Sequence, residues 1–423
     1  MDELFIQYLW KYQKFEPLPL TLTDGSEIRV IKTGFQNHNA GPDFLEAKII
    51  IDELEWSGSV EVHHKSSDWY HHKHEINPDY NNVILHVVYT HDKVVFDEAG
   101  REIPTFEISK FSDGLLEYNY RCYINQPKTL RCERSISGLD HIHITSMFDK
   151  ALTARLEQKS SMIMNIAEAT QFDWEETTYR ALARNFGFST NKLAFEQVTS
   201  VLPFSILRKN LHSESKTMAL IFGTAGMLAN PNDDYSFSLF KEFQFLKTKY
   251  QLKRMLSRHE WKFSRLRPAN FPTIRLAQFG QVLMQLKHPF DLFMSTTTTK
   301  DLYRTLNIEL NDYWTGHYDF GKPLTKGANR LGQQSIDNII INTVVPLLVA
   351  YSKYSDDQLL IAKAINMLSA IKAENNKITR AWQEISIPCN NAYDSQALIY
   401  QYNELCERKK CLQCNIGVAI LQH

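Results

Sequence analysis

Residues early in the chain have the types and spacing of a metal-dependent hydrolytic site. Asp43 directly follows Pro42, and Glu61 stands two residues before His63. Two carboxylates that meet from neighbouring strands offer Mg²⁺ or Mn²⁺ the oxygen ligands it prefers, with positions left for water and a phosphate. A nearby base or cation then stabilises charge on the phosphoryl oxygens. We therefore expect Asp43 and Glu61 as metal ligands, with His63 or Lys65 as the basic catalytic partner.

Histidines crowd the same stretch, because eight of the fifteen in the chain lie between residues 38 and 91. Imidazole nitrogens bind Zn²⁺ and Fe²⁺, so His63, His74 and His86 form an alternative, nitrogen-rich metal centre with non-nucleolytic chemistry. Ordinary interpretations stay open beside these. Asp43 as a turn residue, Glu61 and His63 as solvated strand positions, and His86 as a hydrogen-bonded core histidine explain the same pattern. We interpret the nearby Trp69 as a core residue.

The segments around these residues predict a sheet that follows a first helix. Asp2 is expected to cap that helix. Alternating apolar and polar residues indicate strands at residues 27–33, 45–51, 56–63 and 83–89. Glu61 and His63 leave the same face of the third strand because side chains alternate along a strand. The fourth strand is apolar on both faces apart from His86, as a central strand would be.

A chain of 423 residues is too long for one ordinary core, so we expect more than one domain. Helical periodicity replaces the strand pattern after about residue 140. The sequence therefore predicts an α+β protein. Residues 1–137 form a mixed α/β domain, residues 138–387 a larger, mostly α-helical domain, and residues 388–423 a cysteine-containing module.

Composition and charge bear on the partners and the cellular compartment of the protein. The net charge is −1, so any attraction to a polyanion must be local. The first residues lack the order of a signal peptide, and the apolar run 336–351 is short and interrupted by polar residues, which favours a buried helix over a membrane span. Six cysteines without a signal peptide indicate a reducing cytoplasm. The sequence does not define the oligomeric state.

A local basic stretch occupies residues 247–275, which hold nine Lys and Arg residues and a single acidic residue. Aromatic residues interleave with these charges, and a basic surface with stackable rings is suited to a nucleic-acid backbone. We therefore expect nucleic acid as a partner, although a solvated helix with core-facing aromatics explains the same pattern. The expected contact residues are Arg254, Arg265, Arg267, Arg275 and Trp261.

Cysteines cluster near the end of the chain. Cys406, Cys411 and Cys414 are separated by four and two residues, and Cys389 lies upstream. Four thiolates at such spacing predict a zinc site or an iron–sulfur cluster. The alternative is a set of reduced, buried thiols that pack like small apolar side chains.

The order of helix, strand, strand entered by Pro42-Asp43, strand with Glu61-Val62-His63, connection and strand resembles the PD-(D/E)XK nuclease superfamily. The resemblance implies a restriction-endonuclease-like domain with metal-dependent nuclease activity, and a further acidic residue such as Glu3 on the first helix. Some nucleases of this superfamily are similar in carrying a cysteine-bound cluster near the C-terminus. His63 stands where the superfamily has a lysine, which leaves a third hypothesis, a non-catalytic nucleic-acid-binding or scaffold protein.

A second resemblance covers nearly the whole chain. Its segments include GPDFLEAKI, WSGSVEVHHKSSDWYHHKH, YNNVILHVVY, RPANFPTIRLAQF, YWTGHYDFGKP, IDNIIINTVVPLL and CERKKCLQCNIG. They look like a bacterial family known as domain of unknown function 2851. That resemblance implies no particular activity.

Overall fold

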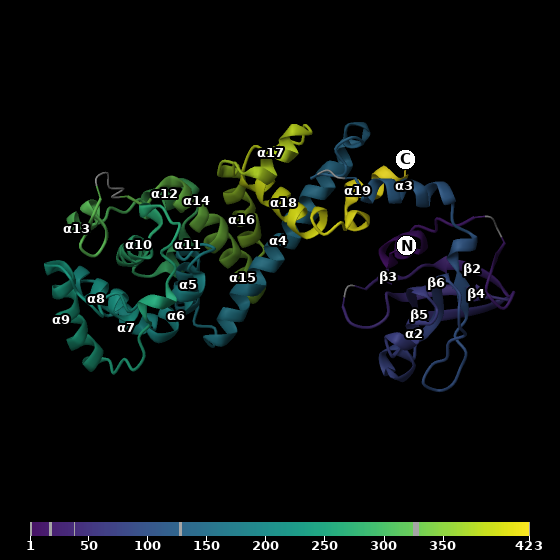
Figure 1. Ribbon diagram of the computed structural model, residues 1–423, viewed down its shortest axis with the longest axis horizontal. Helices are drawn as coiled ribbons and strands as arrows, with labels where there is room; N and C mark the ends of the chain where they lie inside the picture. Colours follow the sequence, from purple (N-terminus) through teal and green to yellow (C-terminus); the bar gives the residue numbers. More distant parts are fainter. Residues whose placement is uncertain (1, 17–18, 38, 127–128, 325–329, 423) are drawn as a thin grey trace. The chain divides into compact units, whose positions relative to one another are not determined.

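The computed structural model describes residues 2–16, 19–37, 39–126, 129–324 and 330–422 of the chain (Figure 1). These residues form two compact units. Unit 1 comprises Met1–Met147, Glu384–Ser386 and Gln401–His423, and unit 2 comprises Phe148–Gln383 and Ile387–Tyr400. Unit 1 contains a mixed sheet and unit 2 is mostly helical, so the expected α+β class and the order of the two parts are confirmed.

Unit 1 is built on a mixed sheet that follows a short amphipathic helix. Its elements are α1 (Glu3–Lys11), β1 (Leu20–Thr21), β2 (Glu27–Lys32), β3 (Phe35–Gln36), β4 (Phe44–Ile51), β5 (Leu54–Lys65), α2 (Asp68–His71), β6 (Val83–Thr90), β7 (Thr105–Glu107), α3 (Gly114–Ile124) and α19 (Asn415–Gln422). Two 3-10 turns, His74–Ile76 and Pro78–Tyr80, lie between α2 and β6. The four strands expected from sequence alternation are all present.

The strands run in the order β1-β2-β4-β5-β6-β7, with β3 paired to β4. The pairs β2–β4 and β4–β5 are antiparallel, whereas β5–β6 and β6–β7 are parallel. A parallel pair needs a crossover of a dozen or more residues, and here α2 and the two 3-10 turns supply it. The register places Phe44 opposite Val60 and Glu61 opposite His86. The start of β4 and the middle of β5 and β6 are therefore neighbours.

Helix α1 covers one face of this sheet. Asp2 caps it by accepting a hydrogen bond from the Phe5 backbone N–H, and the helix buries Phe5, Leu9 and Trp10 completely. These side chains share a core with Val60 and other residues of β4, β5 and β6. Burial of the apolar stripe of α1 in this core holds the helix against the strands.

The opposite face of β5 is also covered, which the alternating sequence did not indicate. Trp69 of α2 is fully buried and packs with Tyr80, Val83 and other residues in a second, smaller core. The indole Nε1 of Trp69 donates to the carbonyl of Phe96 at 3.0 Å. The interpretation of Trp69 as a core residue is confirmed, and the polar face of β5 is enclosed rather than solvated.

Unit 2 is a helical assembly with one small hairpin. Its elements are α4 (His141–Ala169, which begins in unit 1), α5 (Trp174–Phe186), α6 (Lys192–Val201), α7 (Phe204–Arg208), α8 (Glu214–Thr224), α9 (Asp234–Lys249), α10 (Pro272–Leu286), α11 (Pro289–Ser295), α12 (Thr299–Leu306), α13 (Asp312–Gly316), β8 (His317–Asp319), β9 (Lys322–Pro323), α14 (Gln333–Ile339), a π-helical turn (Ile340–Val344), α15 (Val345–Ser355), α16 (Leu359–Ala370), α17 (Lys377–Glu384) and α18 (Ala392–Gln401).

The continuous helical run Gln333–Ser355 is long and apolar enough to cross a membrane by length and composition alone. Its most apolar window has a mean hydropathy of 1.4, and 72% of that window is buried inside the protein. Core helices of soluble proteins pass the same test, so this single helix is weak evidence for a membrane span.

Candidate active site

Asp43 and Glu61 meet where β4 and β5 run side by side. Asp43 immediately precedes β4, and its backbone N–H donates to Glu61 Oε2 at 3.0 Å. In return, Asp43 Oδ2 accepts the backbone N–H of Val62 at 3.1 Å. Each carboxylate is therefore held by the backbone of the other strand. The structure brings together the two acids that the sequence singled out.

Burial disfavours the charged forms of both acids. It raises the pKa of Asp43 to about 7, with a further contribution from the negative charge of Glu61, while hydrogen bonds from Val62 and Gln7 act in the opposite direction. Burial likewise raises the pKa of Glu61 to about 8, and the charge of Glu3 adds to it. Two acids with pKa values displaced to near neutrality are typical of a functional site. A bound cation would reverse both effects.

Helix α1 contributes two further polar side chains to this site. The Gln7 amide donates to Asp43 Oδ1 at 2.9 Å. Glu3, one turn earlier on the same face, is close enough for its charge to act on Asp43, Glu61 and His74. Burial raises the pKa of Glu3, and the neighbouring His72 lowers it. The charge of Glu3 therefore acts on both acids, and its role as a further site acid stays a prediction.

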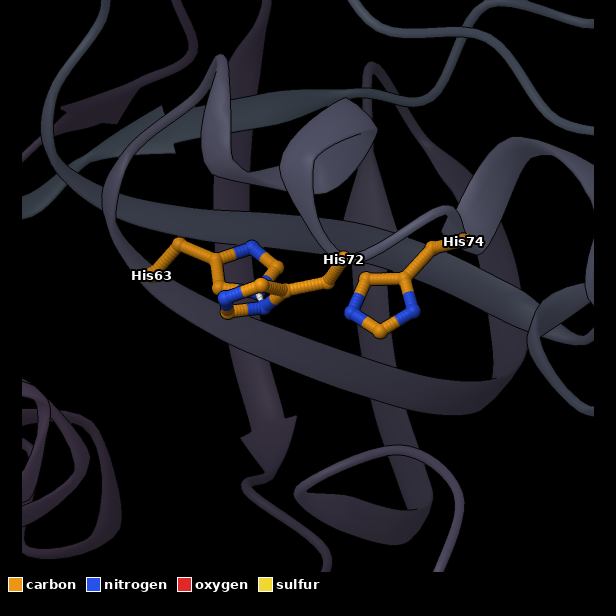
Figure 2. A group of neighbouring side chains, drawn as sticks. All are labelled: His63, His72 and His74. Atoms are coloured by element: carbon orange, nitrogen blue, oxygen red, sulfur yellow. Dashed lines mark hydrogen bonds between the residues drawn. The ribbon is translucent and has the colours of Figure 1, made fainter.

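Three histidines converge beside Glu61. His63 of β5, His72 at the end of α2 and His74 in the following 3-10 turn have ring nitrogens within 4.8 Å of one another. Figure 2 shows these three side chains together. His63 Nε2 lies 3.0 Å from His72 Nδ1 and 3.5 Å from Glu61 Oε1. His74 Nε2 lies 3.3 Å from the same carboxylate oxygen. The three imidazoles therefore form one group of candidate ligand atoms, and Glu61 lies beside two of them, His63 and His74.

His86 supports this group from behind. It lies on β6 and is completely buried, and its Nε2 is 2.8 Å from His63 Nδ1. A second imidazole bonded in this way fixes the orientation of a metal-ligating histidine. The sequence predicted His63, His74 and His86 as a ligand trio. In the structure, His72 takes the third place, and His86 holds His63.

Burial favours the neutral form of the His63, His74 and His86 imidazoles. Burial lowers the pKa of His63 to about 3 and that of His86 well below its ordinary value, and it also lowers the pKa of His74. Apart from the contact between Nε2 and Glu61 at 3.3 Å, neither ring nitrogen of His74 has a polar partner within the described part of the chain. Neutral imidazoles with free lone pairs are the form that binds metal.

The local backbone explains why His72 and His74 reach the same point. Lys73 between them adopts a left-handed conformation with φ of 62°, which turns the chain sharply after α2. The ring of Tyr80 then stacks on His74 with centroids 3.7 Å apart, and Trp69 packs edge-on against it. The small core around Trp69 therefore positions the imidazoles.

Lys65 does not join the carboxylates. It is the last residue of β5 and is exposed, and its backbone N–H donates to Asp68 at 2.9 Å. Its charge acts on Asp92 and His64. The structure therefore does not bear out Lys65 as the basic partner, because the side chain lies beyond the enclosed part of the strand. His63 lies beside Glu61, and burial favours its neutral form.

The residues expected to bind nucleic acid fall into two groups in unit 2. Arg254, Arg265 and Arg267 are exposed, as a phosphate contact requires. Trp261 and Arg275 are buried, and both expectations were wrong. The Trp261 indole donates to the carbonyl of Ala225 at 2.9 Å, so its ring cannot stack on a base. Arg275 is only 7% exposed, and its guanidinium is bonded to neutral side chains within the unit.

The structure groups the cysteines differently from the sequence prediction. Cys406, Cys411 and Cys414 belong to unit 1, whereas Cys389 lies in unit 2, where Asp394 and Glu374 are its charged neighbours. A cysteine that the sequence did not single out, Cys132, joins the three in unit 1.

Sequence reasoning missed His72, Gln7 and Cys132 as members of these sites. The spacing of Gln7 from Glu3, one helical turn, was the available signal for the first of them. His72 was one of several histidines in a polar connection. Only the left-handed turn at Lys73 selects it.

Taken together, unit 1 carries an enclosed site with carboxylate oxygens and neutral imidazoles. Hard divalent cations prefer the former, and zinc or iron accepts both. The fold and the site define a sheet domain with a candidate metal centre. The chain belongs to the family described as protein of unknown function (DUF2851), whose model matches residues 3–377. No curated protein and no solved structure shows significant similarity to it.

Proposed function

We propose that unit 1 is a nuclease-like domain that cleaves nucleic-acid phosphodiesters with a divalent metal ion. The observation that carries the proposal is the pairing of Asp43 and Glu61 across adjacent strands, each held by the backbone of the other. Oxygen ligands fixed in this way suit Mg²⁺ or Mn²⁺ and leave coordination positions for water and a phosphate.

The order of elements supports the same proposal. One helix, an antiparallel set of β2, β4 and β5, a helical crossover and the parallel strand β6 follow one another along the chain. This order resembles that of a PD-(D/E)XK domain, in which Asp43 and Glu61 would be the two acids. A restriction-endonuclease-like fold is therefore part of the proposal.

The residues around the acids have distinct proposed roles. Asp43 and Glu61 would hold the divalent ion, which would supply Lewis-acid chemistry at the phosphate. His74, whose ring nitrogens have no other hydrogen-bond partner among the described residues, accepts a proton from the attacking water. Gln7 orients Asp43, and His86 orients His63.

The exposed arginines Arg254, Arg265 and Arg267 contribute a separate phosphate-binding surface, with binding that weakens as salt rises. We propose the cytoplasm as the compartment.

The test compares variants of two glutamates on the same strand. Single- and double-stranded DNA and RNA are incubated with Mg²⁺ or Mn²⁺ and the wild-type protein, Asp43→Asn, Glu61→Gln or Glu55→Gln. Glu55 lies at the exposed end of β5 and pairs with Lys48 at 2.7 Å, so it controls for loss of charge. We expect cleavage by the wild type and Glu55→Gln, and at least a 100-fold loss in the other two. Equal activity in all four proteins would refute the assignment.

A second candidate function is favoured by the convergence of His63, His72 and His74. A Zn²⁺ or Fe²⁺ ion held by these imidazoles and Glu61 would support metal-dependent chemistry of another kind. His72→Ala distinguishes the two, because His72 is exposed and its loss does not disturb the core. Stoichiometric zinc or iron that disappears in His72→Ala, without cleavage of any nucleic acid, favours this candidate. Metal content that is independent of His72 counts against it.

A catalytically inactive nucleic-acid-binding protein is the remaining proposal. It is favoured by His63 in the place of a lysine and by the exposed arginines of unit 2. It predicts salt-sensitive binding without any requirement for metal, and Asp43→Asn should then leave binding unchanged.

A further inference from the structure

Four cysteines from distant parts of the chain gather at one edge of unit 1. Cys132 follows α3, whereas Cys406, Cys411 and Cys414 precede α19. The Arg131 guanidinium donates to the backbone carbonyl of Cys406 at 2.8 Å, across 275 residues of sequence. Helices α3 and α19 lie against each other (Figure 1). Electrostatic interactions link Cys132 with Cys411 and Cys414, and they link Cys406 with all three.

The backbone around three of these cysteines contains a tight turn. A tight turn brings the Cys414 N–H to 3.1 Å from the Cys411 carbonyl. Gly417 then lies directly against this turn, because a Cβ added there would stand 2.2 Å from the Cys411 carbonyl oxygen. The backbone therefore leaves room only for glycine at this position of α19, which fixes the turn between Cys411 and Cys414.

Hydrogen-bond donors are directed at these sulfurs. The Gln401 amide donates to Cys414 Sγ at 2.9 Å, and the Tyr123 hydroxyl bonds to the sulfur of Cys411. The positive charge of Arg131 acts on Cys406 and Cys411. Thiols that merely fill an apolar core do not require such partners. Donors and a cation around sulfur are the outer shell typical of metal-bound thiolates.

The spacing of the sulfurs bears on what they bind. A single zinc ion with Zn–S bonds of about 2.3 Å holds its four sulfurs about 3.8 Å apart. Among the described residues, the groups of three or more ligand atoms within 4.8 Å of one another contain histidines and carboxylates and no cysteine. A cluster of several irons with bridging sulfides sets its four thiolates further apart. The wider arrangement therefore favours a cluster over one ion.

We infer that Cys132, Cys406, Cys411 and Cys414 bind an iron–sulfur cluster in unit 1, a site that does not include Cys389. The cluster fastens the C-terminal segment to the sheet domain. Leu412 and Leu421 of that segment are buried in the same core as α1 and the strands. The cluster therefore links residues that are separated in the sequence by unit 2, and this link stabilises unit 1. This inference is independent of the nuclease proposal, because it concerns neither Asp43 nor Glu61.

The experiment uses the full-length chain, expressed with iron and purified without oxygen. Iron, zinc and acid-labile sulfide are measured in each preparation, together with the visible absorption of the cluster. We expect stoichiometric iron and sulfide in the wild type and a loss of at least tenfold in Cys132→Ser. Two matched controls, Cys389→Ser and Cys122→Ser, should retain full iron and sulfide, since neither sulfur belongs to the group.

Full iron and sulfide in Cys132→Ser, or their loss in Cys389→Ser, would overturn the ligand assignment. Stoichiometric zinc without iron or sulfide would overturn the cluster, and so would wild-type protein that contains no metal and takes up no iron and sulfide on reconstitution. If Cys132→Ser is insoluble, alkylation of the wild type decides the ligand set. Cys132, Cys406, Cys411 and Cys414 should be protected before chelation and labelled after it, whereas Cys122 is labelled throughout; labelling of Cys132 before chelation refutes the proposal.

Discussion

Replacing Glu61 with glutamine should stabilise metal-free unit 1 at pH 8. Burial raises the pKa of this acid from 4.5 to about 8, so the folded protein holds the Glu61 proton more tightly than the unfolded chain does. Stability from such a group is fully present below pH 4.5 and is lost as the pH rises through about 8. A glutamine of nearly the same shape cannot ionise, and it therefore avoids that loss.

The magnitude follows from the shift in pKa. From 4.5 to about 8 is roughly 3.5 pH units, and each unit corresponds to about 1.36 kcal/mol. At pH 8 the folded group is about half ionised, so ionisation costs up to about 4 kcal/mol of the free energy of unfolding. At pH 5.5 the cost is about 1.4 kcal/mol, because the pH is only one unit above the pKa of the unfolded glutamate. The free energy of unfolding of Glu61→Gln should exceed that of the wild type by these amounts at the two pH values.

The assay is hydrogen exchange of β5 and β6 peptides in increasing urea, with a chelator present, at pH 5.5 and pH 8. Following these peptides isolates unit 1 from the helical unit. Glu55→Gln, on the same strand but exposed, should change stability by no more than about 0.5 kcal/mol at either pH. Adding Mn²⁺ should reverse the order, because the wild type keeps the carboxylate that binds the ion and the variant does not.

The reasoning is refuted if Glu61→Gln is no more stable than the wild type at pH 8. It is also refuted if the gain is the same at both pH values, since the effect would then arise from packing and not from ionisation. Mn²⁺ that stabilises both proteins equally would show that Glu61 is not a ligand.

Further expectations concern the two cores and the basic stretch. Trp69→Ala should lower the free energy of unfolding of unit 1 by about 3–5 kcal/mol in urea, and it should weaken metal binding because the nearby imidazoles lose their support. Gly58→Ala should cost about 1–3 kcal/mol in the same assay, since the added Cβ would stand 2.5 Å from the Asn82 carbonyl oxygen. Trp261→Ala should destabilise unit 2 by about 3–5 kcal/mol, followed by circular dichroism. Arg267→Ala should leave stability within about 0.5 kcal/mol of the wild type and reduce the salt slope of nucleic-acid binding by about 1; unchanged binding would remove it from the proposed surface.

Local pattern was sufficient for much of unit 1. The alternation of apolar residues predicted the four main strands, and the Asp2 cap predicted the first helix. Because side chains alternate along a strand, the sequence also placed Glu61 and His63 on one face, next to Asp43 on the neighbouring strand. These relations depend on neighbours in sequence or on adjacent strands, which is why sequence reasoning reaches them.

Burial was harder to predict, because it depends on what lies above a surface. The sequence pattern predicted a partly solvated polar face for β5, whereas the structure encloses that face under Trp69 and Tyr80. In unit 2, Trp261 and Arg275 read as a nucleic-acid surface, and packing buries both. The same charges and rings occur in either case, and only the arrangement of helices decides between them.

The composition of the two candidate metal sites was decided by tertiary structure. The sequence by itself determined that carboxylates, histidines and cysteines are present, and which strands carry the first of them. The left-handed turn at Lys73 selected His72 as a neighbour of His63, and packing of the C-terminal segment on unit 1 selected Cys132. The physical reason is that a site joins residues far apart in the chain, and the folding of the whole domain sets the distances between them.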